Sequence, residues 1–386
     1  MISYFAVFAA AVVVTAATTP LVRRVVERAG AIYQPNDRTV HRVPLPTLGG
    51  IAMYLGLVAA LIVSQFLPFF DAINGPASHI RATLLTCTLM LGLGVVDDTL
   101  GMTALTKFVA QVFIAGLLVL LGVRFNYFYL PFMGTFVLGD LGVIVTILWA
   151  VAVPNAVNLV DGLDGLAAGM VAIAATAFFI YVVRSGGTFG LPSDAAMLAA
   201  ITCGICLGFL PWNFHPAKIF MGDAGSMLLG MLLAITTILG IGNNITPPGR
   251  NDIVQLAGAI AVPILVLLIP FLDVVLAIIR RTRRGVGIGH ADKEHLHHHL
   301  MDIGHGHRQA VLLMYLWSGL VSGASLAVGL IHGWLPVALI LLGAGVLFLA
   351  TALPRLARRR ATNGAHTSGG RNGNSSDTKP GKISRR

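Results

Sequence analysis

The chain has 386 residues, of which 56% are hydrophobic and only 11% are charged. Because soluble domains carry roughly 25% charged residues, this composition excludes an ordinary soluble globular protein. The mean hydropathy is +0.83, and apolar runs long enough to cross a hydrocarbon layer of roughly 30 Å as a helix recur from Ile2 to Leu353. We therefore predict an all-α, polytopic integral membrane protein.

The apolar runs predict eleven transmembrane helices. The first six lie near residues 2–22, 48–70, 82–96, 105–122, 137–157 and 164–183, and the other five near 194–210, 226–242, 255–279, 309–331 and 335–353. The first run has no basic segment before it and no cleavage site before Arg23, so it is interpreted as a retained span and not as a signal peptide. Residues 1–354 form the predicted transmembrane domain.

The basic residues are unequally distributed between the two sets of connections. If the N-terminus lies outside, the inner connections and the tail hold 22 Lys and Arg residues, whereas the outer connections hold 4. By the positive-inside rule, the N-terminus is predicted outside and the C-terminus in the cytoplasm.

Most of the net charge of +10 belongs to the tail, residues 355–386, which holds nine basic residues against Asp377. The tail is rich in Gly, Ser and Asn and lacks apolar periodicity, so we predict a disordered segment that contacts anionic lipid. The charge therefore gives no reason to expect a nucleic-acid partner.

Polar residues are costly in a membrane, and here they gather in three connections on one predicted side. Five carboxylates and two lysines occur there: Asp97, Asp98, Asp161, Asp164, Asp223, Lys107 and Lys218. The excess of acid would repel itself unless a divalent cation or a cationic group compensated it. Oxygen donors of this kind are the ligands that Mg²⁺ prefers.

Asp97 and Asp98 directly follow the predicted span 82–96. Adjacent residues of a helix point about 100° apart, so both could face one polar cavity without sharing a proton. The alternative is a solvated helix end with no further role.

The polar residues Asn155, Asn158, Asp161 and Asp164 recur every three residues. On a helix this spacing predicts one slowly rotating, ligand-facing stripe, although the glycines at 162 and 165 permit a break. Capping by Asp161 or Asp164 is the alternative. Asp223 precedes another apolar run, where it is predicted either to cap the helix or to bind a ligand at the helix N-terminus.

Seven of the twelve histidines lie between residues 290 and 307. His295 and His299 have the i, i+4 spacing of a zinc pair, but no Cys accompanies them. Histidine and arginine together favour phosphate binding. Cys203 and Cys206 lie inside an apolar run and are predicted to pack between helices.

Taken together, four motifs resemble a known family. Asp97-Asp98 followed by Lys107, NAVNLVDGLDGLAAG (155–169), AKIFMGDAGS (217–226) and HADKEHLHHHL (290–300) are similar, in order and topology, to the polyprenyl-phosphate N-acetylhexosamine-1-phosphate transferases. The resemblance covers about residues 20–353. It implies that residues 1–354 are a catalytic domain that transfers a sugar 1-phosphate from a UDP-sugar to a polyprenyl phosphate, releases UMP and uses Mg²⁺ or Mn²⁺.

Two branches of this family remain open. The pattern Asp-Lys-Glu-His-Leu-His-His (292–298) resembles the WecA-like branch, which uses UDP-GlcNAc, whereas the additional His299 keeps the phospho-MurNAc-pentapeptide transferases as the alternative. The predicted orientation places the three polar connections, and so the active site, on the cytoplasmic face. The resemblance further implies a homodimer in the cell membrane and a product that starts an envelope glycan. A secondary transporter, the distant alternative, would place polar groups near the midplane and on both faces.

The resemblance also implies roles for single residues. Asp223 and Asn158 would hold the metal, Lys107 would contact the phosphates, and Asp97 would be the base, with Asp98 in support; the roles of these two aspartates are exchangeable. The remaining expected substrate-binding residues are Asn155, Asp161, Asp164, Arg281, His295, His297 and His298.

Overall fold

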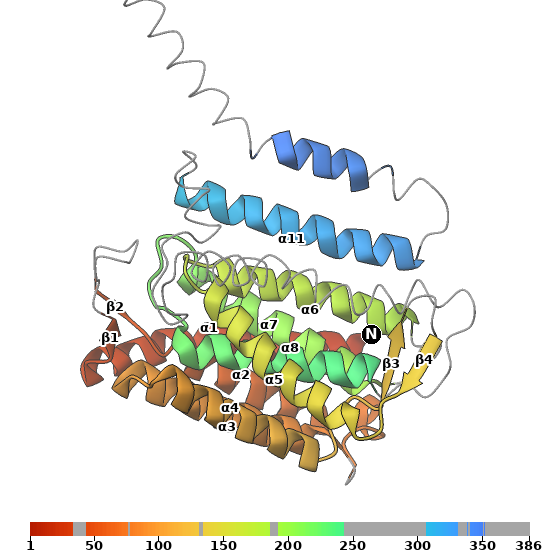
Figure 1. Ribbon diagram of the computed structural model, residues 1–386. Helices are drawn as coiled ribbons and strands as arrows, with labels where there is room; N and C mark the ends of the chain where they lie inside the picture. The colour runs from red at the N-terminus through yellow and green to blue at the C-terminus, as the bar shows by residue number, and fades with distance from the viewer. Residues whose placement is uncertain are drawn as a thin grey trace, which may run out of the picture.

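The structure is a computed structural model that describes residues 1–33, 44–75, 78–130, 134–185, 192–242, 306–330, 338, 340–349 and 351. This part of the chain is mostly helical (Figure 1). Its helices are α1 (Ile2–Ala29), α2 (Gly50–Gln65), the 3-10 helix η1 (Pro68–Phe70), α3 (Ile80–Leu100), α4 (Ala104–Leu120), α5 (Leu141–Val160), α6 (Leu166–Ser185), α7 (Asp194–Asn213), α8 (Gly222–Ile241) and α11 (His307–Leu330).

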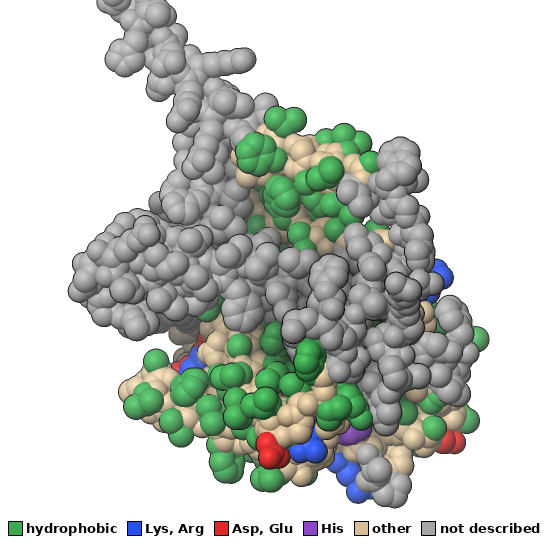
Figure 2. Space-filling view, turned by 45° about the vertical axis from the view of Figure 1, so that its right-hand side comes forward, with side chains coloured by type: hydrophobic (Ala, Val, Ile, Leu, Met, Phe, Trp, Pro, Cys, Tyr) green, Lys and Arg blue, Asp and Glu red, His purple; other side chains and the backbone are tan. Residues whose placement is uncertain are grey.

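Six helices of the described part are long and apolar enough to cross a membrane, namely α1, α3, α5, α6, α7 and α8. The helices α2 and α4 and a further helix over Ile340–Leu349 are shorter and also apolar. Figure 2 shows hydrophobic side chains over much of the visible described surface, as expected for helices that face lipid. The predicted membrane fold is thus confirmed, whereas the number of eleven spans stays a prediction because the span 255–279 lies outside the described residues.

Two small antiparallel hairpins depart from the all-α prediction. The first pairs β1 (Ile32–Tyr33) with β2 (Leu45–Pro46), and the second pairs β3 (Tyr127–Leu130) with β4 (Gly134–Val137). The second hairpin is rich in Tyr and Phe, which favour extended backbone. Both lie in connections between helices, where the hydropathy pattern carries no strand period.

Helix α8 is the core of the fold. Its apolar window is completely buried, and α2, α3, α5 and α7 pack against it (Figure 1). A helix that is apolar on all sides is expected to be buried on all sides, and the sequence of α8 is of this kind. The position and direction of α8 therefore determine where the residues at its ends lie.

Glycines let the first turn of α8 approach its neighbours closely. A Cβ added at Gly94 of α3 would lie 2.4 Å from the Cα of Ala224, and one at Gly50 of α2 would lie 2.3 Å from the backbone nitrogen of Gly225. The Gly50 amide also donates to the carbonyl of Met221 over 3.0 Å. Small residues at such crossings bring backbones together in membrane proteins, and here they join the polar ends of α3 and α8.

This packing makes a testable prediction for α3. Gly94→Ala should lower the apparent unfolding temperature of the purified protein in detergent, because overpacking against backbone atoms costs about 1–3 kcal/mol. Gly92→Ala is the matched control on the same helix, since no atom lies within 4 Å of a Cβ added there. Equal unfolding temperatures for the two variants would contradict the close approach of α3 and α8.

Candidate functional site

Asp97 and Asp98 lie in the last turn of α3, which continues to Leu100 and ends at Gly101 with a positive φ of 69°. The prediction that a connection begins directly after Val96 is therefore wrong by one helical turn. Both carboxylates are bonded in this last turn, Asp97 to Lys107 and the Met102 amide and Asp98 to the amides of α8. Their side chains point to different neighbours, as the angle of about 100° between adjacent helical residues predicts.

Asp98 caps α8 from a neighbouring helix. Its Oδ1 accepts a hydrogen bond from the Asp223 amide over 2.9 Å, and its Oδ2 accepts one from the Ala224 amide over 3.0 Å. These are first-turn N–H groups that have no partner inside α8, and an anion is favoured at this end of a helix. Gly222, with a φ of 69°, leaves room, because a Cβ there would lie 2.4 Å from the Asp98 Oδ2.

The alternative that Asp223 itself caps α8 is not observed. The N-cap residue is Met221, and no side chain of the cap residue accepts a hydrogen bond. The side chain of Asp223 points instead to the ammonium group of Lys107, with which it forms a hydrogen-bonded ion pair. Asp223 is thus available for chemistry while Asp98 holds the helix end.

Lys107 bridges two carboxylates from different helices. Its Nζ lies 2.7 Å from the Asp97 Oδ2 and also contacts the Asp223 Oδ2. The other Asp97 oxygen accepts a hydrogen bond from the Met102 amide over 2.8 Å. The Asp223 side chain remains 31% exposed, twice as much as that of Asp97. The cluster of Asp97, Lys107 and Asp223 is therefore open on the Asp223 side.

Asn158 completes this cluster from the last turn of α5. Its Nδ2 donates to the hydroxyl of Ser226 on α8 over 3.2 Å, and its amide is within hydrogen-bonding reach of the Asp223 carboxylate. Asn158 and Asp223, predicted together as metal ligands, are thus adjacent. Their oxygen atoms and those of Asp97 are the donor atoms that Mg²⁺ or Mn²⁺ prefers.

Asn155 is engaged inside the protein. Its Nδ2 donates to the Gln111 Oε1 over 2.6 Å and to the carbonyl of Val151 over 2.7 Å. Gln111 is only 1% exposed and lies one helical turn after Lys107 on α4. The sequence analysis did not identify Gln111. An amide side chain inside an apolar helix requires a polar partner, so its position was a usable indication of a polar contact.

The prediction of one continuous polar stripe from Asn155 to Asp164 is wrong for its second half. Helix α5 ends at Val160, and α6 begins at Leu166. Gly165, directly before α6, has a φ of 76°, a non-helical conformation that glycine adopts readily. We call residues 161–165 the donor-side turn; it carries Asp161 and Asp164, so these two carboxylates do not share a helix with the asparagines.

Asp164 is 2% exposed and is bound by the segment after α7. Its Oδ2 lies 2.8 Å from the Nδ1 of His215 and accepts a hydrogen bond from the Ala217 amide over 3.1 Å. Asp161 is close to the rest of the acidic cluster. Loss of hydration, followed by the carboxylates of Asp223, Asp98 and Asp164, raises the pKa of Asp161 well above its usual range.

The five carboxylates of the three connections therefore converge at one end of the helices, as the sequence predicts. The predicted residues Arg281, His295, His297 and His298 lie outside the described residues. The described chain resumes at residue 306, and Asp164, His215 and His307 have ligand atoms within 4.8 Å of one another.

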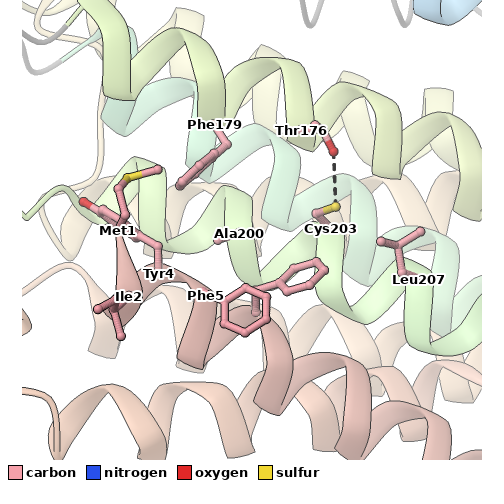
Figure 3. A pocket seen from close by; sticks show the side chains of 10 residues that line it. Met1, Ile2, Tyr4, Phe5, Thr176, Phe179, Ala200, Cys203 and Leu207 are labelled. Atoms are coloured by element: carbon pink, nitrogen blue, oxygen red, sulfur yellow. Dashed lines mark hydrogen bonds between the residues drawn. The ribbon is translucent and has the colours of Figure 1, made fainter.

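An apolar cavity of about 610 Å³ lies among α1, α6 and α7 (Figure 3). Its lining includes Phe5, Phe179, Leu207 and Cys203, and the Cys203 sulfur contacts the Thr176 hydroxyl over 3.2 Å. This contact agrees with the predicted packing role of the cysteines. Among the described residues that line it, no side chain carries a charge that could compensate a phosphate group, so the polar cluster is the candidate active site.

Comparison with known proteins gives matches that cover this cluster. The family model described as glycosyl transferase family 4 matches residues 80–241. The decaprenyl-phosphate N-acetylglucosaminephosphotransferase of Mycobacterium tuberculosis is 40% identical over 90% of this chain and 88% of its own length. The probable undecaprenyl-phosphate N-acetylglucosaminyl 1-phosphate transferase of Bacillus subtilis is 36% identical over 77% of each chain.

A member of the other branch matches as well. The phospho-N-acetylmuramoyl-pentapeptide-transferase of Mycolicibacterium smegmatis is 31% identical over 75% of this chain and 85% of its own length. The matched residues 80–241 include Asp97, Asp98, Lys107, Asn158 and Asp223, the residues that meet at the ends of α3, α4, α5 and α8. By these matches, the chain belongs to glycosyl transferase family 4.

Proposed function

We propose that this protein transfers GlcNAc-1-phosphate from UDP-GlcNAc to a polyprenyl phosphate and releases UMP. The observation that carries the proposal is the convergence of Asp97 and Asp223, from two helices, on the single ammonium group of Lys107. Such a partly open, charged cluster at one end of apolar helices suits a reaction between a water-soluble donor and a lipid phosphate. Relatives named as N-acetylglucosamine phosphate transferases at 36% to 40% identity support GlcNAc over the muramoyl pentapeptide.

The residues of the cluster fit a divalent cation. The ammonium of Lys107 lies between two carboxylates, so their oxygens converge on a position suitable for a cation. The side-chain amide of Asn158 lies beside Asp223, and its oxygen is a ligand atom of the kind that Mg²⁺ accepts. We assign Mg²⁺, or Mn²⁺ in its place, to Asp223 and Asn158. A metal bound there would offset the negative charge of the donor pyrophosphate.

The protein groups then have distinct roles. Lys107 binds the transferred phosphate by charge-assisted hydrogen bonds. Asp97 orients the acceptor phosphate or takes its proton, because its carboxylate adjoins Lys107 and has a fixed second oxygen. Asp98 keeps Asp223 in place through the amides of α8. Phosphoryl transfer depends mainly on positioning and charge neutralisation, which this arrangement supplies without a covalent nucleophile.

We assign the donor-side turn to binding of the UDP-sugar. Asp161 and Asp164 lie on this turn, next to the α5 end that carries Asn155 and Asn158. The assignment extends to Arg281, His295, His297 and His298, whose histidine and arginine side chains suit a pyrophosphate. We further propose a homodimer in the cell membrane, with its active site at the cytoplasmic face, that makes the first lipid-linked intermediate of an envelope glycan.

The reaction is tested with purified protein in detergent, polyprenyl phosphate, Mg²⁺ and either UDP-GlcNAc or UDP-MurNAc-pentapeptide. We expect UMP release from UDP-GlcNAc alone and a loss of roughly 100-fold or more in Asp223→Asn, because charge stabilisation by a bound metal is worth several kcal/mol. Asp71→Asn, an exposed carboxylate beyond the far end of α2, is the control and should keep full activity. UMP from the pentapeptide donor instead would assign the protein to the muramoyl branch.

The orientation is tested by cysteine labelling in cells. The native cysteines, Cys87, Cys203 and Cys206, are buried, so the background reaction with a membrane-impermeant maleimide should be low. Ala104→Cys, exposed beside the acidic cluster, should react only after the membrane is permeabilised, whereas Asp71→Cys at the opposite end should react in intact cells. The reverse pattern would place the cluster outside and exclude a cytoplasmic active site.

A further inference from the structure

Helix α11 contacts the donor-side turn directly, although about 150 residues separate them in sequence. The hydroxyl of Tyr315 donates a hydrogen bond to the carbonyl of Gly165. Its ring lies against Gly169 on α6, where an added Cβ would come within 2.0 Å of the ring Cζ. The glycines at 165 and 169 thus leave the space that Tyr315 occupies.

The first turn of α11 makes a second contact, through His215. The Nε of Arg308 donates to the carbonyl of His215 over 3.2 Å. The ring of His307 stacks on the ring of His215 with centroids 4.3 Å apart and an angle of 23° between the planes. His215 in turn binds the Asp164 carboxylate. Helix α11 therefore contacts Gly165 directly and Asp164 through His215.

The other side of the turn is held by α7. Asn213, the last residue of α7 and 1% exposed, accepts a hydrogen bond from the Gly165 amide over 3.1 Å and donates one to the carbonyl of Ile219 over 3.1 Å. Both backbone groups of Gly165 are therefore bonded to helices: the amide to α7, and the carbonyl to α11 and to the Gly169 amide of α6. A turn that carries a glycine with positive φ needs such fixing, because the glycine backbone is otherwise the most free of any residue.

The group of Asp164, His215 and His307 has donor atoms close enough for a metal ion, but its geometry favours a positioning role. The lone pair of an imidazole nitrogen lies in the plane of the ring. Two stacked, nearly parallel rings direct these lone pairs side by side and not toward one central ion. A histidine that hydrogen-bonds a carboxylate and stacks on a second ring is instead fixed in orientation.

We propose that α11 is a positioning element for the donor. Tyr315 of α11 holds the donor-side turn directly, and the first turn of α11 holds it through His215, which binds Asp164. Together these contacts keep the turn in the arrangement that binds the UDP-sugar. This proposal rests on the proposed function of the cluster. Helix α11 begins at His307, and the histidine-rich segment 290–305 precedes it in the chain. Tyr315 and His215 act through the turn and touch no reacting atom.

The test uses the full-length protein and the variant Tyr315→Phe, which removes only the hydroxyl. Its KM for UDP-GlcNAc should rise about fivefold, the equivalent of one partly buried hydrogen bond. The KM for polyprenyl phosphate and kcat should stay within about twofold of the wild type. Tyr54→Phe is the matched control, because its hydroxyl pairs with Thr88 between α2 and α3, away from the donor-side turn.

A second variant, on α6, displaces the ring of Tyr315. Gly169→Ala should force Tyr315 to move and thus raise the KM for UDP-GlcNAc as Tyr315→Phe does. In the background of Tyr315→Ala, which vacates the space, Gly169→Ala should have no further effect on this KM. Such non-additivity is expected of two residues in contact and distinguishes a specific contact from a general weakening of α6.

Binding without turnover separates this proposal from the proposed function. Calorimetric titration of UDP-GlcNAc in the presence of Mg²⁺ should show a dissociation constant about fivefold higher in Tyr315→Phe than in the wild type. If Tyr315→Phe binds UDP-GlcNAc fivefold more weakly than the wild type, but the wild type releases no UMP, only the proposed function is overturned. Equal dissociation constants in wild type and variant, a wild type that binds no UDP-GlcNAc, or an equal rise of both KM values would overturn the positioning role.

Discussion

The two hydrogen bonds from the first amides of α8 to Asp98 are the interaction on which the site depends. A buried helix must have its first N–H groups satisfied, and α8 receives this cap from α3. The cap couples two requirements, because the contact that completes the core helix also places Asp223 beside Lys107. Gly94 and Gly222 leave the space that this approach needs.

Adjacent aspartates on one helix can have different functions because they face different neighbours. Both carboxylate oxygens of Asp98 accept the hydrogen bonds of the cap, whereas Asp97 faces Lys107 and the Met102 amide. Three positive groups therefore compensate the acidic cluster in part: the ammonium of Lys107 and the dipoles of two N–H groups at the start of α8. Burial, followed by the field of the other acids, raises the pKa of the Asp161 carboxyl.

The sequence was sufficient for the features that follow from local pattern and membrane cost. Apolar runs predicted the helices, and the cost of burying charge predicted that Asp97, Asp161 and Asp223 meet at one end. The sequence was insufficient where a partner lies far along the chain. Nothing local shows that Gln111 binds Asn155 or that Tyr315 binds Gly165. The period of three residues continued through Asp164, although α5 ends at Val160 and Asp164 is bound by the segment after α7.

The two halves of the site are supported by different parts of the fold. Asp223 and Asn158 belong to α8 and α5, which pack against each other in the core, so the proposed metal side shares the rigidity of the core. The donor-side turn is instead held by hydrogen bonds from α7 and α11 to Gly165 and from the segment after α7 to Asp164. A change in α11 can therefore alter how a donor is held while the contacts of Lys107 stay intact. In this protein, the contacts that hold the donor-side turn are thus separate from those that place the proposed metal ligands.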